Sequence, residues 1–244
     1  MNFADVIAQL HHQLGAAASA TLATSLQRYF PHPVAALGVS NDSVAQIAAE
    51  AVKRHPELGD DAWLNIAEHF ARSHAFHEHF ILASALVAKV AGKLADDGRL
   101  LDRLQSWLEA DVSNWAQCDD LCIKPLYVYL KRQPQLLARI VTWGSSQSPW
   151  CRRASNVALV KFVGRSDHID FGQICANCER LLPDRDVYVQ KGIGWMLKVA
   201  SQHEQDAVLA FLRQHASVMA RPTLRYAIEK LPTELRRPFI VGKH

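Results

Sequence analysis

Hydrophobic residues recur at a helical spacing along nearly the whole chain. Repeats of three and four residues are clear in five stretches, namely 44–52, 63–70, 101–108, 136–141 and 208–212. Such a spacing places the apolar side chains on one face of an α-helix. A half-buried β-strand would need alternating apolar and polar residues, and no segment sustains that alternation. The pattern therefore predicts an all-α protein.

Short breaks separate the helical stretches, for example near Pro56, Gly98, Pro134 and Pro183. Helices of about 10 to 16 residues joined by such breaks are typical of stacked helical hairpins, each a repeat of about 40 residues in the HEAT manner. No strict sequence repeat is present, and no Gly/Ser-rich linker divides the chain. We therefore expect residues 1–244 to form a single domain, a curved α-solenoid of HEAT-like helical hairpin repeats whose concave face holds the function.

Composition limits the class of protein further. A chain of 244 residues that is 49% hydrophobic and 21% charged can bury a substantial core. Its longest apolar stretch, Ile81–Val90, is far shorter than the roughly 20 residues that span a bilayer. The first residues lack the basic start and apolar run of a secretory signal. The odd number of cysteines, 5, argues against a disulfide framework. We expect a soluble, monomeric protein of the cytoplasm without membrane contact.

The net charge of +3 permits nucleic-acid binding but does not by itself argue for it. The distribution of charge is more informative. The first 50 residues hold one arginine and no lysine, whereas Arg152–Arg165 holds three arginines and Lys161 with no acidic residue.

Two groups of potential metal ligands have a structural interpretation instead. Cys175 and Cys178 form a single CxxC without the second pair that would complete a zinc site, and we interpret them as helix residues one turn apart. The segment His74–His79 (HAFHEH) lacks the HExxH spacing, and we interpret its polar residues as helix-end and surface residues. No phosphate-binding glycine motif or nucleophile elbow is present. We expect neither a metal nor a cofactor.

The predicted helix Val187–Ser201 carries a tryptophan on its polar face. Its apolar residues fall on one side, and Lys191, Trp195 and Lys198 fall together on the other. In one interpretation a neighbouring helix covers Trp195. In the other, the tryptophan is an aromatic platform between two cations, an arrangement that nucleic-acid binders use.

The segment Asn114–Lys131 has the opposite anomaly. One narrow stripe of this predicted helix contains Trp115, Asp119, Cys122, Leu126 and Leu130. Because an isolated buried carboxylate is costly, Asp119 must pair with a cation or face a cleft. A structural salt bridge is one interpretation. The other is a site for a cationic ligand, because Trp115 lies one turn away and adds an aromatic face to the negative charge.

Two arginines stand near the start of the helix that Pro149 opens. Arg153 flanks the apolar stripe of that helix, and Arg152 points roughly opposite. Cations in a first turn oppose the helix dipole, which is a local cost. Pairing with Asp119 or contact with a phosphate would offset it.

Together these segments resemble a known family. NWAQCD at Asn114–Asp119, SPWCRRA at Ser148–Ala154 and QKGIGWMLK at Gln190–Lys198 are similar in order and spacing to the AlkD-type DNA alkylation repair family. The resemblance runs from about Tyr29 to Pro232, which is nearly the whole chain.

The resemblance implies HEAT-like repeats that wrap double-stranded DNA on a basic concave face. It implies a monofunctional DNA glycosylase of base excision repair, which hydrolyses the N-glycosidic bond of cationic N3- and N7-alkylated purines such as 3-methyladenine and 7-methylguanine. The reaction would need neither a metal nor base flipping. The implied cleft residues are Trp115, Asp119, Arg153 and Trp195, and the DNA-binding residues are Arg152, Lys161, Lys191 and Lys198.

Two other functions stay open. The first is a non-catalytic HEAT-repeat protein that recognises damaged or branched DNA. The second is a protein–protein adaptor, which is a common use of α-solenoids. An adaptor has no need for Trp115, Asp119 and Trp195 in these unusual positions.

Overall fold

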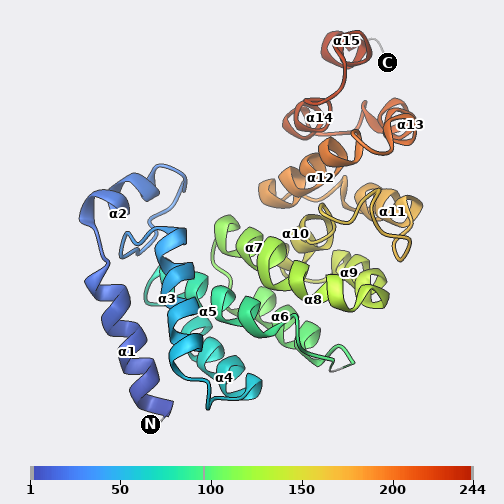
Figure 1. Cartoon of the computed structure of the whole chain (residues 1–244). Coiled ribbons are helices and arrows are strands. Elements are labelled where there is room, and N and C mark those ends of the chain that lie inside the picture. The colour runs from blue at the N-terminus through green and yellow to red at the C-terminus, as the bar shows by residue number, and fades with distance from the viewer. Residues whose placement is uncertain (1–2, 96, 243–244) are drawn as a thin grey trace. The chain divides into compact units, whose positions relative to one another are not determined.

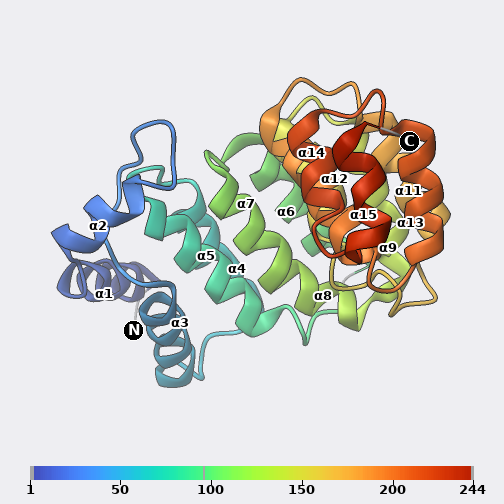
Figure 2. The ribbon, with the colours of Figure 1, turned by 90° about the horizontal axis from the view of Figure 1, so that it is seen from above.

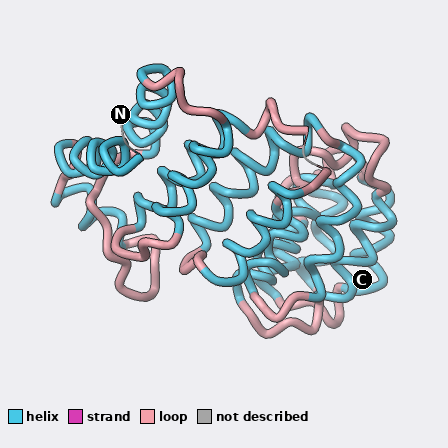
Figure 3. The backbone as a smooth tube through the Cα atoms, turned by 90° about the horizontal axis from the view of Figure 1, so that it is seen from below, coloured by secondary structure: helices cyan, strands magenta, loops and turns pink. Residues whose placement is uncertain are grey.

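The computed structural model describes residues 3–95 and 97–242. Within these ranges the regular structure is helical, and no strand occurs (Figure 3). The predicted all-α class is confirmed. Among the described residues, none of the helices combines the length and the apolarity that a bilayer crossing requires.

The chain divides into two compact units, Met1–Arg132 and Gln133–His244. Unit 1 contains α1 (Phe3–Ala16), α2 (Ala20–Gln27), α3 (Asn41–Arg54), α4 (Asp60–Ala71), α5 (His77–Val90), α6 (Arg99–Ala110), α7 (Trp115–Leu121), the π-helix η1 (Cys122–Leu126) and α8 (Tyr127–Arg132). Unit 2 contains the 3-10 helices η2 (Pro134–Leu136) and η3 (Trp143–Ser145), with α9 (Leu137–Thr142), α10 (Pro149–Val157), α11 (Phe171–Leu181), α12 (Val187–Ala200), α13 (Gln205–His215), α14 (Arg221–Ala227) and α15 (Thr233–Val241). That residues 1–244 act as a single domain stays a prediction.

In unit 1 the central helix is α5. It packs against α3, α4, α7 and η1, and Figure 1 shows α5 between α3 and α7. Nearly all of its side chains are buried as a result, which explains why its sequence is the longest apolar stretch. Alternate helices thus stack directly in the order α3, α5, α7, as helical hairpin repeats do.

In unit 2 the corresponding layer is α10, α12 and α14, with α12 in the middle (Figure 1). Figure 2 shows α12 and α14 from above. The close approach of α14 explains one of the two glycines inside α12. A Cβ atom on Gly194 would lie 3.0 Å from the Cβ atom of Tyr226 and 3.1 Å from the carbonyl oxygen of Thr223. Any larger residue at this position would push the two helices apart.

Local capping sets the starts of the helices that carry the candidate residues. The side chain of Asn114 accepts hydrogen bonds from two backbone N–H groups at the start of α7. Ser148 caps α10, with Pro149 in its first position, and Asp186 caps α12. These are the residue types that helix starts prefer, so the helices that carry the three resembling segments begin at favourable caps.

The histidine-rich segment before α5 corrects one expectation. The structure confirms that it lies at a helix end, since α5 begins at His77. The prediction of surface residues is wrong for His77, Glu78 and His79, all of which are buried. The Glu78 carboxylate accepts hydrogen bonds from the backbone N–H groups of Leu37, Gly38 and Val39, at 2.7 to 3.1 Å. Partners about 40 residues away cannot be read from a local pattern.

Candidate functional site

Trp115 and Asp119 lie one turn apart on α7 in unit 1. The Asp119 side chain is buried, with 9% of the residue exposed, and Trp115 is half-buried. The other members of the predicted stripe, Cys122, Leu126 and Leu130, are buried as well. The interpretation of Asp119 as a carboxylate on an apolar stripe is therefore confirmed. A negative charge at such a position is little screened by water and acts strongly on a nearby cation.

The turn that follows α7 is wider than an α-helical turn. The π-helix η1 spans Cys122–Leu126 and contains Pro125, which has no N–H group to donate. A π-helical turn within a helix is rare and often occurs at a functional site. The predicted helix Asn114–Lys131 is therefore confirmed as helical, but a change of pitch divides it directly after the Trp115–Asp119 turn.

The neighbouring carboxylate, Asp120, was not singled out from the sequence. It accepts a hydrogen bond of 2.6 Å from the Ser84 hydroxyl of α5 and forms an ion pair with Lys124 of η1. These contacts tie α7 to α5 and to the π-helix. Asp120 thus forms a structural salt bridge, and both interpretations of Asp119 remain predictions. Only its spacing of four residues from Lys124 could have indicated the pair.

Trp115 is held on one side by the segment that follows α2. Its indole N–H donates a hydrogen bond of 3.3 Å to the backbone carbonyl of Tyr29. The ring of Phe30 packs against the indole, with 5.7 Å between centroids and an interplanar angle of 35°. Buried tryptophan and phenylalanine rings favour such offset contacts. These contacts restrict the orientation of the indole ring.

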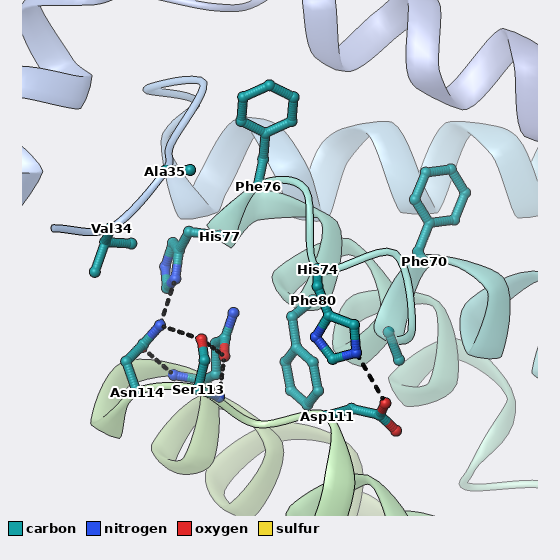
Figure 4. Close-up of a pocket in the computed structure, with 12 residues that line it drawn as sticks. Val34, Ala35, Phe70, His74, Phe76, His77, Phe80, Asp111, Ser113 and Asn114 are labelled. Atoms are coloured by element: carbon teal, nitrogen blue, oxygen red, sulfur yellow. Dashed lines mark hydrogen bonds and ion pairs between the residues drawn. The ribbon is translucent and has the colours of Figure 1, made fainter.

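A pocket lies beside the start of α7 (Figure 4). Its lining includes the apolar residues Val34, Phe76 and Phe80 and the polar residues His77, Asp111 and Asn114. Asp111 pairs with His74 at 3.3 Å. Burial raises the pKa of Asp111, and the nearby His74 and Arg72 oppose that shift. The pocket therefore has a polar wall next to the helix that carries Trp115 and Asp119.

In unit 2, Arg152 contacts the loop before α10 and the loop between α11 and α12. Its guanidinium group donates to the Asp184 carboxylate at 2.6 and 3.4 Å and to the backbone carbonyls of Ser146 and Gln147 at 3.0 and 2.8 Å. An arginine with this many contacts fixes the positions of its neighbours. Its pairing partner within unit 2 is Asp184.

Arg153 is the more deeply buried of the two arginines, with 5% of the residue exposed. It donates a hydrogen bond of 2.5 Å to the backbone carbonyl of Tyr188 in the first turn of α12. Its aliphatic stem lies next to Gly192 of the same helix. The predicted position of Arg153 along the apolar stripe is confirmed, and its contacts link α10 to α12.

The three candidate residues of α12 differ in their surroundings. Lys191 is exposed, and its ammonium nitrogen lies 5.4 Å from the centroid of the Tyr188 ring. Trp195 is half-buried. Lys198 forms an ion pair of 2.7 Å with Glu229 and lies 4.7 Å from the centroid of the Tyr226 ring. Residues from the α14 region therefore engage Lys198, a contact that the helical pattern of α12 alone could not show.

The remaining candidates lie in unit 2 as well. Lys161 is an exposed residue in the turns after α10, and partial desolvation lowers the pKa of its ammonium group. Cys178 is buried and Cys175 partly buried on α11, as predicted. Burial raises the pKa of the Cys175 thiol to about 11. Among the described residues, no group of three or more histidine, cysteine or acidic side chains has the arrangement of a metal site.

The structure thus brings Trp115 and Asp119 together in unit 1. The other candidates belong to unit 2, namely Arg152, Arg153, Lys161, Lys191, Trp195 and Lys198. Within unit 2, direct contact joins α10 to α12 through Arg153 and joins α12 to the α14 region through Lys198.

The described residues form helical hairpin repeats, which places this chain in the class of helical repeat proteins. The repeats carry the combination of tryptophan, acidic and basic residues described above. The comparison with protein families then gives the particular family. The pattern of the family described as DNA alkylation repair enzyme matches residues 10–231. This chain belongs to that family, as the three sequence segments predicted.

Solved structures support the same fold. A predicted DNA alkylation repair enzyme from Enterococcus faecalis is similar with a TM-score of 0.77 at 12% identity, covering 88% of this chain and 97% of that one. AlkD2 from Streptococcus mutans is similar with a TM-score of 0.66 at 17% identity, covering 95% of this chain and 100% of its own. Smu.31 from Streptococcus mutans UA159 has a TM-score of 0.56 at 18% identity, with 91% and 96% covered. No curated protein matches this sequence.

Proposed function

We propose that this protein is a monofunctional DNA glycosylase that releases cationic N3- and N7-alkylated purines from double-stranded DNA. Membership of the DNA alkylation repair enzyme family supports an enzymatic role in repair. The observation that carries the specific proposal is the buried Asp119 carboxylate one turn from the half-buried Trp115 on α7.

The charge of the substrate explains why a carboxylate suits the reaction. An N3- or N7-alkylated purine is positively charged and leaves as a neutral base, so its departure needs little acid assistance and no metal. Breaking the N-glycosidic bond moves positive charge onto the deoxyribose, which becomes an oxocarbenium-like cation. A fixed negative charge beside that cation lowers the energy of the transition state, and it can also orient the attacking water.

The two tryptophans would act on the same positive charge by a weaker interaction. An indole face attracts a cation with about 1 to 2 kcal/mol when both groups are desolvated. In the proposal, Trp115 and Trp195 each offer such a face to the cationic sugar or base. The restraint of Trp115 by Tyr29 and Phe30 supports this role, because a held ring loses less entropy on binding.

Unit 2 would supply the contacts to the phosphate backbone. We assign Arg153 to the phosphate next to the lesion and Lys161, Lys191 and Lys198 to phosphates farther away. Arg152 is held by Asp184 and two carbonyl groups, so its predicted contact with DNA would extend an existing network. Recognition would then depend on the charge of the lesion, and neutral lesions would be poor substrates.

The test is incubation with duplex DNA that contains one N7-methylguanine, followed by chromatographic detection of the released base. A duplex with a neutral lesion such as hypoxanthine is the matched substrate control. We expect release from the cationic lesion and little from the neutral one.

The same assay separates the alternatives. Tight, salt-sensitive binding of the lesion duplex without base release would favour the non-catalytic DNA-binding protein. Weak, salt-independent DNA binding would favour the adaptor, because phosphate contacts always release counterions. Equal release of the neutral lesion would contradict recognition by charge.

A further inference from the structure

His77 connects three parts of unit 1 that surround Trp115. It is buried at the first position of α5. Its backbone N–H donates a hydrogen bond of 2.8 Å to the carbonyl of Ala35, in the segment between α2 and α3. Its ring nitrogen Nδ1 lies 3.4 Å from the side-chain nitrogen of Asn114, as the dashed line in Figure 4 shows. One residue therefore contacts both the segment after α2 and the start of α7.

The contact with Asn114 has a defined direction. The Oδ1 atom of Asn114 accepts hydrogen bonds from the backbone N–H groups of Ala116 and Gln117, both at 3.1 Å. The atom that faces His77 is then the NH₂ group, which can only donate. Nδ1 of His77 must accept, so the ring is neutral with its proton on Nε2. A protonated ring would place two donors against each other.

A chain of rings provides the second connection. The centroid of the Phe30 ring lies 5.9 Å from that of His77 and 5.7 Å from that of Trp115. Phe30 itself is buried, and Gln27 donates to its backbone carbonyl at 3.3 Å. The His77 ring therefore contacts both the residue that caps α7 and the ring that packs on Trp115.

We propose that neutral His77 is a positioning residue for Trp115, acting through Asn114 and Phe30, and that its protonation loosens Trp115. This role rests on the proposed glycosylase function only where it concerns the rate of base release. The restraint on Trp115 is a property of unit 1 that exists without DNA.

The charges around His77 set where in pH this switch operates. Burial lowers the pKa of His77, and the carboxylates of Glu78 on α5 and Asp120 on α7 partly oppose that shift. His74 and Asp111 line the same pocket. The neutral form that holds Asn114 therefore predominates above about pH 6.5, the ordinary histidine value, and is lost as the pH falls through the lowered pKa.

The first measurement reads Trp115 directly. The full chain is labelled with 5-fluorotryptophan, and the Trp115 signal is assigned in the ¹⁹F NMR spectrum by its loss in Trp115→Phe. Between pH 7.5 and 4.5 we expect this signal to titrate in the wild-type protein. In His77→Asn, where the amide oxygen can replace Nδ1 as an acceptor that does not titrate, the signal should lose this transition.

Two further variants separate the contacts. His77→Phe keeps a ring against Phe30 but removes the acceptor for Asn114, so the Trp115 signal should shift even at pH 7.5. The matched control is His74→Gln, which changes a histidine of the same pocket that pairs with Asp111. We expect the control to leave both the position and the titration of the Trp115 signal unchanged.

Base release provides the second readout. At pH 7.5 we expect His77→Phe to lower the single-turnover rate about tenfold with DNA affinity unchanged within about twofold, because a misplaced binding wall affects the reaction more than the encounter. His77→Asn should retain more of the rate than His77→Phe, and its rate should fall less than that of the wild type on acidification.

The NMR result decides the proposal whether or not the protein releases bases. A Trp115 signal that does not titrate, or one that titrates equally in wild type and His77→Asn, would overturn it. If the signal behaves as expected but N7-methylguanine is not released, His77 positions Trp115 and the proposed glycosylase function is wrong.

Discussion

The two units carry opposite charge. Unit 1 has 15 acidic residues against 11 lysines and arginines, a net charge of −4 with histidine neutral, whereas unit 2 has 9 against 16, a net charge of +7. The overall value of +3 hides this division. A DNA polyanion is attracted by unit 2 and repelled on average by unit 1. Under the proposed function, unit 2 would supply affinity and unit 1 would supply the negative charge that a cationic transition state requires.

The buried charges follow the same division. Among the described residues, the buried carboxylates Glu78, Asp111, Asp119 and Asp120 all belong to unit 1, and the buried arginine Arg153 belongs to unit 2. Glu78, Asp111 and Asp120 have clear structural partners in backbone N–H groups, His74 and Lys124 respectively. Asp119 differs from them in lying one turn from a half-buried tryptophan. This position beside an aromatic ring is why we propose a chemical role for Asp119.

The largest expected effect is that of Asp119→Asn, which removes the charge and keeps the size. We expect release of N7-methylguanine to fall by about 10²-fold or more, as when one preorganised electrostatic group is lost. DNA affinity should hold or rise slightly, because repulsion of phosphate decreases. Single-turnover rates and binding isotherms on the same duplex measure the two effects.

Asp111→Asn is the matched control for that substitution, since it neutralises another buried carboxylate of unit 1. Its rate should stay within about threefold of the wild type. Equal losses in the two variants would mean that the net charge of unit 1 matters and the position of Asp119 does not. Native-rate release by Asp119→Asn would refute the mechanism, and loss of folding in that variant would favour a purely structural carboxylate.

The tryptophan substitutions test whether the aromatic residues of α7 and α12 both contribute to base release. Trp115→Ala and Trp195→Ala should each lower the release rate about tenfold, in line with loss of one desolvated cation–π contact. The effect should be smaller than that of Asp119→Asn, because the charge remains. Release that depends on Trp115 and is unaffected by Trp195→Ala would exclude Trp195 from the proposed site.

The salt dependence of binding tests the assignment of affinity to unit 2. Lys191→Ala should reduce the slope of log K against log salt by about 1 and weaken binding to damaged and undamaged duplex equally. Lys198 is already paired with Glu229, so Lys198→Ala should have a smaller effect and Glu229→Gln should strengthen binding. Lys53→Ala, an exposed substitution in unit 1, is the control. An equal change of this slope in Lys53→Ala would contradict the assignment of DNA affinity to unit 2.

The smallest effect concerns stability in acid, where buried histidines distinguish unit 1. Burial, followed by the nearby His11, lowers the pKa of His79 to about 4. Because the unfolded chain has the ordinary value near 6.5, neutral His79 contributes its full stability above pH 6.5, and that contribution is lost as the pH falls from about 6.5 toward 4. After allowance for solvent screening we expect a loss of about 1 kcal/mol.

Urea unfolding at pH 7.5 and 5.0 measures this loss, and His79→Gln should reduce the difference between the two conditions. Hydrogen exchange shows which helices lose stability in acid. Protection in α1, α4 and α5, which surround the His11–His79 ring pair, should fall before that in α10, α12 and α14. A uniform decrease across the chain would contradict the assignment to unit 1.

The sequence alone determined the features that depend on neighbours three and four residues apart. Apolar periodicity predicted the helices, and the caps Asn114, Ser148 and Asp186 that the structure shows at their starts are local contacts too. The same spacing placed Asp119 beside Trp115, because one helical turn relates them wherever the helix lies. The α7 part of the candidate site could therefore be predicted without a structure.

The tertiary structure decided what each polar side chain contacts. His77, Glu78 and His79 had the pattern of surface residues, and packing of α5 against α3, α4 and α7 buried them. Arg152 pairs with Asp184, and Lys198 pairs with Glu229, each about 30 residues away in the sequence. A local pattern contains no information about such partners, because folding alone brings distant segments within the few ångströms over which hydrogen bonds and ion pairs act.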